Sequence, residues 1–263
     1  MHYFDRMSLN PEQRLFCSIC VGDTVGAKKV RNPIVGYGGA GGGGKSYGLR
    51  AACVYALLTA TAAGFPGQTA VLATTDFPRL RDRHYAAFAE QYAWLGATVG
   101  DSHKYGPHVH FKAAPHIGIV KLRNLANPDG FRGSESIMVA IDEPTELPEN
   151  IKGQPVLGLL LYPLRTLAGM PFSTLCMGMN PDGIGHGHMK RLFITGESVK
   201  PNDRHRIFFI KATAADNHAI TQDWYNNLEY LSESVRKARL EGSWDSPSGV
   251  RFPTLSREAH LFK

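Results

Sequence analysis

The stretch that most constrains this chain is a glycine-rich loop at residues 39–46, GAGGGGKS. A short apolar run at residues 33–36 precedes it and predicts a strand, and a helix-prone run at residues 47–63 follows it. Glycine lets a backbone pass close to phosphate oxygens, and successive backbone N–H groups ahead of a helix form an anion site. The pattern G-x-x-x-x-G-K-[ST] between a strand and a helix therefore predicts a phosphate-binding P-loop rather than a flexible linker.

The residue types in this loop assign a task to each position. Lys45 would reach the β and γ phosphates of ATP as a point charge, and the Ser46 hydroxyl would bind Mg²⁺. Upstream of the loop, the amide of Gln13 could read adenine, or it could face solvent on a helix. The residues expected around the nucleotide are Gln13, Gly39, Gly41, Gly42, Gly43, Gly44, Lys45, Ser46 and Tyr47.

A second apolar run, residues 137–141, ends in Asp142-Glu143. It predicts a buried strand that delivers Asp142 to the Mg²⁺ opposite Ser46, the arrangement of a Walker B element. Glu143 would then be the general base that polarises the attacking water. A carboxylate at that position favours water as the phosphoryl acceptor, and therefore an ATPase over a small-molecule kinase.

Composition sets outer limits on the function. The chain has 263 residues, 43% of them hydrophobic, and a net charge of +6, which suits one α/β domain with a polyanionic partner. Its most apolar run, residues 51–63, is too short to span a bilayer, so we expect no membrane association. Cys17 and Cys20 have no second pair, and an amphipathic helix explains them better than zinc binding or redox chemistry.

Further apolar runs predict the rest of an α/β fold. The runs typical of buried parallel strands are residues 69–75, 173–179 and 207–211. Residues 109–122 predict a hairpin. The segments expected to form helices are residues 76–90, 156–166 and 221–241. We therefore expect a P-loop NTPase with a mainly parallel central sheet flanked by helices.

Four stretches carry more information than these general patterns. They are GGAGGGGKS, FRGSESIMVAIDE, MGMNPDGIGHGHMKRLFI and ATAADNHAITQDWYNNLEYLSESVRKARLEGSWD, which begin at Gly38, Phe131, Met177 and Ala212. Together they resemble the ATPase domain of the large terminase subunit of tailed bacteriophages, the motor that packages DNA into procapsids. The last two stretches are more specific than the first two, whose motifs many unrelated ATPases share. The resemblance implies a RecA-like (ASCE) fold with ATP and Mg²⁺ as cofactors.

The resemblance also implies roles for single residues. Lys45 and Ser46 match the Walker A lysine and serine, and Asp142 and Glu143 match the Walker B aspartate and the catalytic glutamate. Asn180 matches the motif that couples hydrolysis to movement. Its place after an apolar strand would also suit a residue that senses the γ-phosphate.

An arginine finger is a further expectation. Arg132 stands where some relatives place an arginine that acts across a subunit boundary, although it could instead pair with a structural carboxylate. An arginine at the γ-phosphate is worth about 10³–10⁵ in rate. The reserve candidates are Arg79, Arg81, Arg83 and Arg123. The helix that carries the first three could also face DNA phosphates or a neighbouring subunit, with a solvated face as the default.

The chain departs from its relatives in two ways. Many of them carry an arginine inside the P-loop, where this chain has Ala40 and glycines. A complete large terminase also continues into an RNase H-like nuclease, and late acids such as Asp245 and Glu258 are not followed by strands that would hold two metals. We expect no nuclease activity in this chain. The expected domains are residues 1–220 as the ATPase core, 221–245 as a small helical lid and 246–263 as a linker toward an absent nuclease.

The expected function is therefore ATP-driven movement of double-stranded DNA into procapsids in the host cytoplasm. The resemblance implies a homo-oligomeric ring on the portal protein with the small terminase subunit, although the isolated chain could be a monomer. The DNA would be held through its phosphates, and the candidate contacts are Lys190, Arg191, Arg204 and Arg206. The alternatives are a helicase- or recombination-type P-loop DNA ATPase, a small-molecule kinase and a nucleotide-regulated scaffold.

Overall fold

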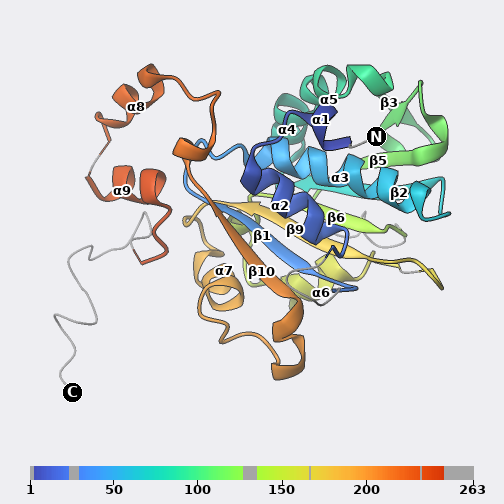
Figure 1. Ribbon diagram of the computed structural model, residues 1–263. Coiled ribbons are helices and arrows are strands. Elements are labelled where there is room, and N and C mark those ends of the chain that lie inside the picture. The colour runs from blue at the N-terminus through green and yellow to red at the C-terminus, as the bar shows by residue number, and fades with distance from the viewer. Residues whose placement is uncertain (1–2, 24–29, 127–134, 166, 232, 246–263) are drawn as a thin grey trace.

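A twisted eight-stranded sheet forms the centre of the molecule, in the strand order β10-β1-β9-β6-β2-β5-β4-β3 (Figure 1). The computed structural model describes residues 3–23, 30–126, 135–165, 167–231 and 233–245. The strands of this sheet are β1 Ile34–Gly39, β2 Gln68–Thr74, β3 Ala97–Ser102, β4 Gly106–Phe111, β5 Gly118–Asn124, β6 Met138–Asp142, β9 Thr174–Met179 and β10 Ile207–Ala212. A separate small ribbon pairs β7 Asn150–Ile151 with β8 Gln154–Pro155.

The sheet is parallel from β10 across to β5, and β4 and β3 continue it antiparallel. The prediction of a mainly parallel sheet is therefore confirmed, as is the hairpin of β4 and β5. Strand β3, which pairs with β4 at the edge of the sheet, was not predicted. Its sequence, ATVGDS, mixes apolar and polar residues and most of them are partly exposed, so it lacks the apolar run that marks the buried strands.

Helices cover both faces of the sheet. The α-helices are α1 Tyr3–Met7, α2 Pro11–Cys20, α3 Lys45–Ala62, α4 Phe77–Leu80, α5 Ala86–Gln91, α6 Val156–Leu161, α7 His186–Phe193, α8 Gln222–Leu228 and α9 Glu233–Glu241. The short elements are the π-helix η1 Arg81–Tyr85 and the 3₁₀ helices η2 Ala93–Leu95, η3 Pro115–Ile117, η5 Pro144–Glu146, η6 Pro201–Arg206 and η7 Ala214–Asp216. In Figure 1, α1 to α5 pack on one face of the twisted sheet, and α6 and α7 pack on the other.

Alternate residues of the buried strands pack on opposite faces. In β6, Met138 and Ala140 join the core under α2, α3 and α5, whereas Val139 and Ile141 join the core over α6 and α7. Both faces are therefore apolar, which is why these strands read as continuous hydrophobic runs. The amphipathic-helix interpretation of Cys17 and Cys20 is also confirmed, since α2 buries both thiols.

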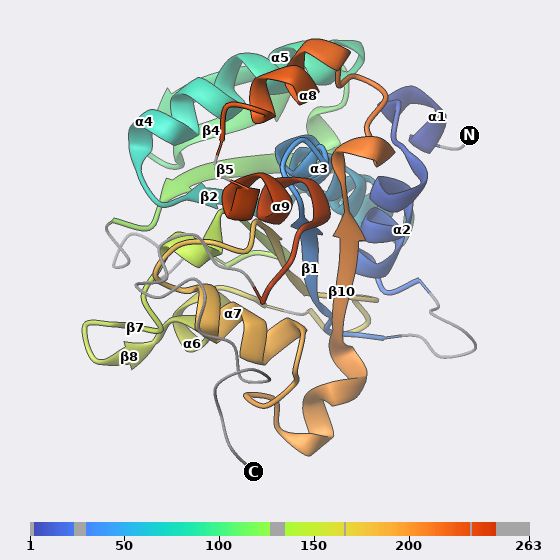
Figure 2. The same ribbon diagram turned by 90° about the vertical axis from the view of Figure 1, so that its left-hand side faces the viewer.

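Two helices differ from their predicted extents. Residues 76–90 form α4, η1 and α5 in succession, so a π-helical segment interrupts the expected helix. The helix expected at residues 156–166 ends at Leu161. Figure 2 shows α8 and α9, the expected lid, on the side of the molecule where β1 ends. Among the described residues, no helix has the length and hydropathy needed to cross a membrane.

Register determines where the polar residues after each strand meet. Gly39 of β1 lies beside Ala212 of β10, and Asp142 of β6 lies beside Gly178 of β9. The carboxyl ends of β1, β9 and β6 therefore share one edge of the sheet. In parallel α/β sheets this edge is where ligands bind.

The close approach of the β5 backbone to the β2 backbone at Gly118 can be tested by mutation. Gly118 has φ +111°, and a Cβ there would lie 1.8 Å from the carbonyl oxygen of Gln68. We expect Gly118→Ala to lower the free energy of unfolding by about 4 kcal/mol, from backbone strain and overpacking together. Gly64→Ala is the control, because Gly64 has φ +90° and nothing within 4 Å of its Cβ position. It should lose only about 1 kcal/mol in urea denaturation, and equal losses in both variants would contradict the close-approach explanation.

Candidate active site

The glycine loop connects β1 to α3 at the ligand-binding edge of the sheet. Gly44 is the N-cap of α3 and has φ +71°, a left-handed conformation that glycine adopts without strain. A Cβ on Gly44 would lie 2.6 Å from Nε2 of Gln13. The loop thus turns tightly into the helix N-terminus, the geometry that binds phosphate.

Side chains from three separate segments hold the loop through its carbonyl groups. Gln13 Nε2 donates to Gly44 O at 3.1 Å, Asn217 Nδ2 to Gly42 O at 2.6 Å, and the Tyr37 hydroxyl to Gly43 O at 3.1 Å. Gln13 is 5% exposed and also accepts from the N–H of Asn10, in a capping box. The solvent-facing interpretation of Gln13 is therefore wrong, because its amide bonds to the P-loop itself. Its contact with adenine stays a prediction.

Tyr47 was expected among the nucleotide ligands, but its side chain points elsewhere. Its hydroxyl donates to Met7 O at 2.6 Å, and the guanidinium of Arg50 lies 5.9 Å from its ring centroid. The ring packs against the core on the α2 side of the sheet. Any contact of Tyr47 with the nucleotide would therefore come from its backbone.

Lys45 lies inside the loop and is 8% exposed. Its Nζ donates to Ala40 O at 2.8 Å. Burial lowers the pKa of this ammonium, while the nearby carboxylates of Glu143 and Asp142 act in the opposite direction. A cation held here among few partners favours an anionic ligand at the loop.

Ser46 and Asp142 meet directly, as expected from the sequence. The Ser46 hydroxyl donates to Asp142 Oδ2 at 2.8 Å. Asp142 is 1% exposed, and its other oxygen, Oδ1, is buried with no hydrogen-bond partner among the described residues. A buried, unsatisfied carboxylate oxygen beside a hydroxyl is a donor set that fits Mg²⁺. Burial raises the pKa of Asp142, but the interactions with His84, the hydrogen bond from Ser46 and the charge of Arg83 together outweigh it and hold that pKa below its usual value.

Glu143 follows Asp142 in a strained conformation. It has φ +58°, which is uncommon for a residue with a side chain and is found most often at functional sites. Its N–H donates to Gly178 O at 2.8 Å. Burial, and then the charge of Asp142, raise the pKa of the Glu143 carboxyl to about 6. A carboxylate with a pKa near neutrality suits a general base.

Asn180 lies after β9 and contacts Glu143. Its Nδ2 donates to Glu143 Oε1 at 3.3 Å, and its Oδ1 is buried without a hydrogen-bond partner among the described residues. The sequence suggested Asn180 as a sensor of the γ-phosphate. The described contact is with the expected base, so Asn180 connects Glu143 to the segment that leads into α7.

Arg83, for which a solvated face was the default expectation, lies beside both Walker B carboxylates. Its Nη1 is 3.7 Å from Asp142 Oδ2 and 3.8 Å from Glu143 Oε1, with the side chain 41% exposed. His84, the next residue, bonds to Asp142 from within the core. The sequence named Arg83 only as one of four reserve arginines and did not mark His84, because the π-helical turn that brings both to Asp142 is not visible in the sequence.

The other reserve arginines lie away from these carboxylates. Arg79 pairs with Asp76 and Glu146, and Arg81 pairs with Asp82 at the surface. Arg123 Nη2 donates to Tyr105 O at 2.6 Å and so ties the turn before β4 to β5. Arg132 lies outside the described residues, so its role as a finger stays a prediction.

Three of the four candidate DNA contacts are engaged in ion pairs within the chain. Lys190 Nζ is 2.6 Å from Asp245 Oδ1, and Arg191 Nη2 is 2.7 Å from Glu149 Oε2. Arg206 pairs with Asp203 within η6. These are exposed or partly exposed pairs, which typically contribute little stability.

The expected lid contacts the P-loop directly. The N–H of Gly41 donates to Arg239 O of α9 at 2.7 Å, and Trp224 of α8 lies next to the same glycine. Beyond α9, Trp244 is buried against His186 of α7. The lid segment therefore touches both the phosphate loop and the helix that follows Asn180. The domain boundaries themselves stay predictions.

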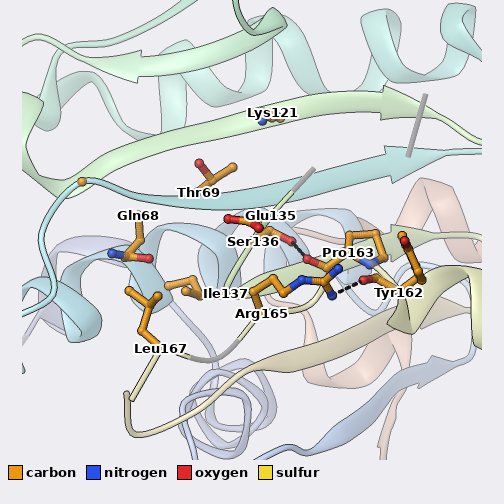
Figure 3. A pocket seen from close by; sticks show the side chains of 11 residues that line it. Gln68, Thr69, Lys121, Glu135, Ser136, Ile137, Tyr162, Pro163, Arg165 and Leu167 are labelled. Carbon is orange, nitrogen blue, oxygen red and sulfur yellow. Dashed lines mark hydrogen bonds between the residues drawn. The ribbon is translucent and has the colours of Figure 1, made fainter. Parts of the chain in front are cut away.

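A hollow of about 480 Å³ lies at the opposite edge of the sheet. Figure 3 shows Thr69, Lys121, Ser136 and Arg165 around it, at the level where β2 and β6 begin. Arg165 bonds to the carbonyl oxygen of Tyr162, and Ser136 to that of Pro163. None of the expected site residues lines it, so the hollow is separate from the candidate active site.

The chain has a RecA-like P-loop fold: a mostly parallel sheet flanked by helices, with Lys45, Ser46, Asp142 and Glu143 at one edge. No protein-family profile and no curated protein sequence matches the chain. Solved structures do match, and the fold is that of the ATPase domains of phage large terminases.

Two of these structures illustrate the likeness. The large terminase of a thermophilic bacteriophage, solved in complex with ADP, has a TM-score of 0.61 at 16% identity, over 89% of this chain and 53% of that one. The ATPase domain of the Thermus phage P74-26 large terminase has a TM-score of 0.56 at 12% identity, over 92% and 97%. This chain thus spans about half the length of the first terminase. At these identities the likeness establishes the fold.

Proposed function

We propose that this chain is the ATPase motor of a phage DNA-packaging terminase, which hydrolyses ATP to move double-stranded DNA. The observation that carries the proposal is the contact of Ser46 with Asp142, next to Glu143 and Asn180, at the carboxyl edge of the sheet. The large terminase of the thermophilic bacteriophage, which has the same fold, was solved with ADP and with ATP-γ-S. We infer that the nucleotide of this chain is ATP.

The side chains of the site divide the work of hydrolysis. Lys45 and the loop N–H groups bind the phosphates, and Ser46 and Asp142 are the residues that would hold Mg²⁺. When bound, that ion supplies charge neutralisation at the phosphates. Glu143 accepts the proton of the attacking water. Asn180 orients the Glu143 carboxylate through its hydrogen bond to Oε1. Arg83 adds a positive charge beside Glu143 within the same chain.

The larger assembly belongs to the same proposal. A homo-oligomeric ring on a portal protein, together with a small terminase subunit and in the host cytoplasm, would use this ATPase on double-stranded DNA. A net charge of +6 suits a partner held through its phosphates. Addition of linear double-stranded DNA should therefore raise the ATPase rate at low salt, and the effect should fade as salt rises. A rate unaffected by DNA at every salt concentration would contradict the motor proposal.

The finger proposal for Arg132 predicts a dependence on protein concentration. If Arg132 acts across a subunit boundary, the ATPase rate per chain rises with concentration, and Arg132→Ala lowers the assembled rate by about 10³–10⁵. Steady-state phosphate release, measured over a concentration series with and without DNA, checks this. Arg165→Ala is the control, since Arg165 is exposed beside the hollow at the opposite edge of the sheet and was not a candidate for the finger. A rate per chain that is constant with concentration and unchanged in Arg132→Ala would exclude the trans finger.

A further inference from the structure

His84 lies at the one π-helical segment among the described residues, between α4 and α5 above the sheet (Figure 1). Its side chain is 0% exposed, and its Nε2 is 3.2 Å from Asp142 Oδ2. π-helical turns occur frequently at functional sites. This one points consecutive residues, Arg83 and His84, toward the same carboxylate.

The hydrogen bond between Arg50 and His84 fixes the tautomer of the His84 ring. Arg50 Nη1 lies 3.3 Å from His84 Nδ1. A guanidinium has only donors, so Nδ1 must be the acceptor of this bond. The ring proton then resides on Nε2, which donates it to Asp142. Arg50, His84 and Asp142 thus form a directed chain of hydrogen bonds.

Arg50 is itself held in place by further bonds from its guanidinium. It is 7% exposed, its Nε donates to Gln91 Oε1 at 2.7 Å, and its Nη1 also donates to Arg83 O at 3.2 Å. Arg50 is on α3, the helix that begins with Lys45 and Ser46. The chain of bonds therefore joins the P-loop helix, the π-helical segment and β6.

These hydrogen bonds fix the orientation of the Asp142 carboxylate. Two donors, Ser46 Oγ and His84 Nε2, both bond to its Oδ2. Oδ1 is left buried and without a partner among the described residues. A carboxylate fixed in this way holds its second oxygen, Oδ1, in a constant direction. Partners that orient a metal ligand typically change metal affinity by about 10–100-fold when they are removed.

We propose that His84, set by Arg50, is a positioning residue that aims Oδ1 of Asp142 at the divalent cation of the site. The inference rests on the proposed function for the identity of that cation. His84 does not touch nucleotide or water in this proposal, and it acts only through Asp142.

The first test reads the tautomer in the nucleotide-free chain. Nitrogen-15 NMR of the histidine rings, with His84→Gln used to assign the signal, should give an acceptor-type shift for Nδ1 and a protonated-type shift for Nε2 at neutral pH. The opposite tautomer, or a ring protonated on both nitrogens, would overturn the proposal. This result does not depend on ATP hydrolysis or on DNA.

The second test measures cation affinity directly. Mn²⁺ titration of the ADP-bound chain, followed by electron paramagnetic resonance, should show a loss of about 10–100-fold in His84→Leu. His84→Gln, whose amide can donate where Nε2 does, should recover most of that loss. Metal-free ADP affinity should stay near the wild-type value in both. His116→Leu, at an exposed histidine of η3, is the control.

The outcomes separate the inference from the proposed function. Unchanged Mn²⁺ affinity in His84→Leu, or an equal loss in a folded His84→Gln, would overturn the positioning role. If His84→Leu fails to fold, the His84→Gln titration and the tautomer decide the question. A wild-type chain that binds no ADP would overturn the proposed function instead. The NMR measurement of the His84 tautomer would still test whether Arg50, His84 and Asp142 form the chain of hydrogen bonds.

Discussion

Replacement of Glu143 by glutamine should slow ATP hydrolysis by about 10²–10⁴-fold while ATP still binds. The amide has nearly the shape of the carboxylate and can still accept a hydrogen bond from Asn180 Nδ2. It cannot take a proton from water. Single-turnover phosphate release gives the rate, and equilibrium titration with a fluorescent ATP analogue gives the affinity.

The matched control is Glu146→Gln, the same chemical change three residues further along. Glu146 pairs with Arg79 and Thr75 and does not contact Asp142 or Asn180 in any described bond. Its hydrolysis rate should remain about that of the wild type. Phosphate release at the wild-type rate in Glu143→Gln would remove Glu143 from the role of base.

The second large effect is expected at Lys45. Truncation of one partner of a buried charge pair costs about 2–5 kcal/mol, so Lys45→Ala should weaken ATP binding by about 30- to 5,000-fold. Because burial already lowers the pKa of this ammonium, its removal should not lower the melting temperature of the nucleotide-free chain. Isothermal titration calorimetry and circular dichroism measure the two quantities.

Lys112→Ala provides the comparison for Lys45→Ala, since Lys112 is exposed beyond the end of β4. It should leave ATP affinity unchanged. ATP affinity that stayed within a few-fold of the wild type in Lys45→Ala would show that the loop does not use this lysine for phosphate.

The parts of the site that follow strand ends were predictable from the sequence. Parallel strands end at a common edge, so a P-loop after β1 and an acid after β6 had to approach one another. The 2.8 Å contact of Ser46 with Asp142 is the result. The apolar runs predicted these strands because both of their faces are buried.

The parts that depend on helix geometry and long-range contacts were not predictable. Arg83 and His84 reach Asp142 through a π-helical turn, and nothing in the local sequence distinguishes that turn from an α-helix. Arg50 is a buried arginine in an apolar helix, and only the fold shows that it faces His84. The position of the Tyr47 side chain was not predictable for the same reason, since its hydroxyl bonds to a helix that precedes the sheet, and its contact with the nucleotide stays a prediction.

Phosphate release from ATP by the wild-type chain, with Lys45→Ala as the blank, tests the central claim most directly. We predict that Mg²⁺-dependent release by the wild type is well above that of Lys45→Ala, and that it increases further with double-stranded DNA. Release by the wild type no greater than that of Lys45→Ala, at every concentration and with DNA present, would contradict the claim.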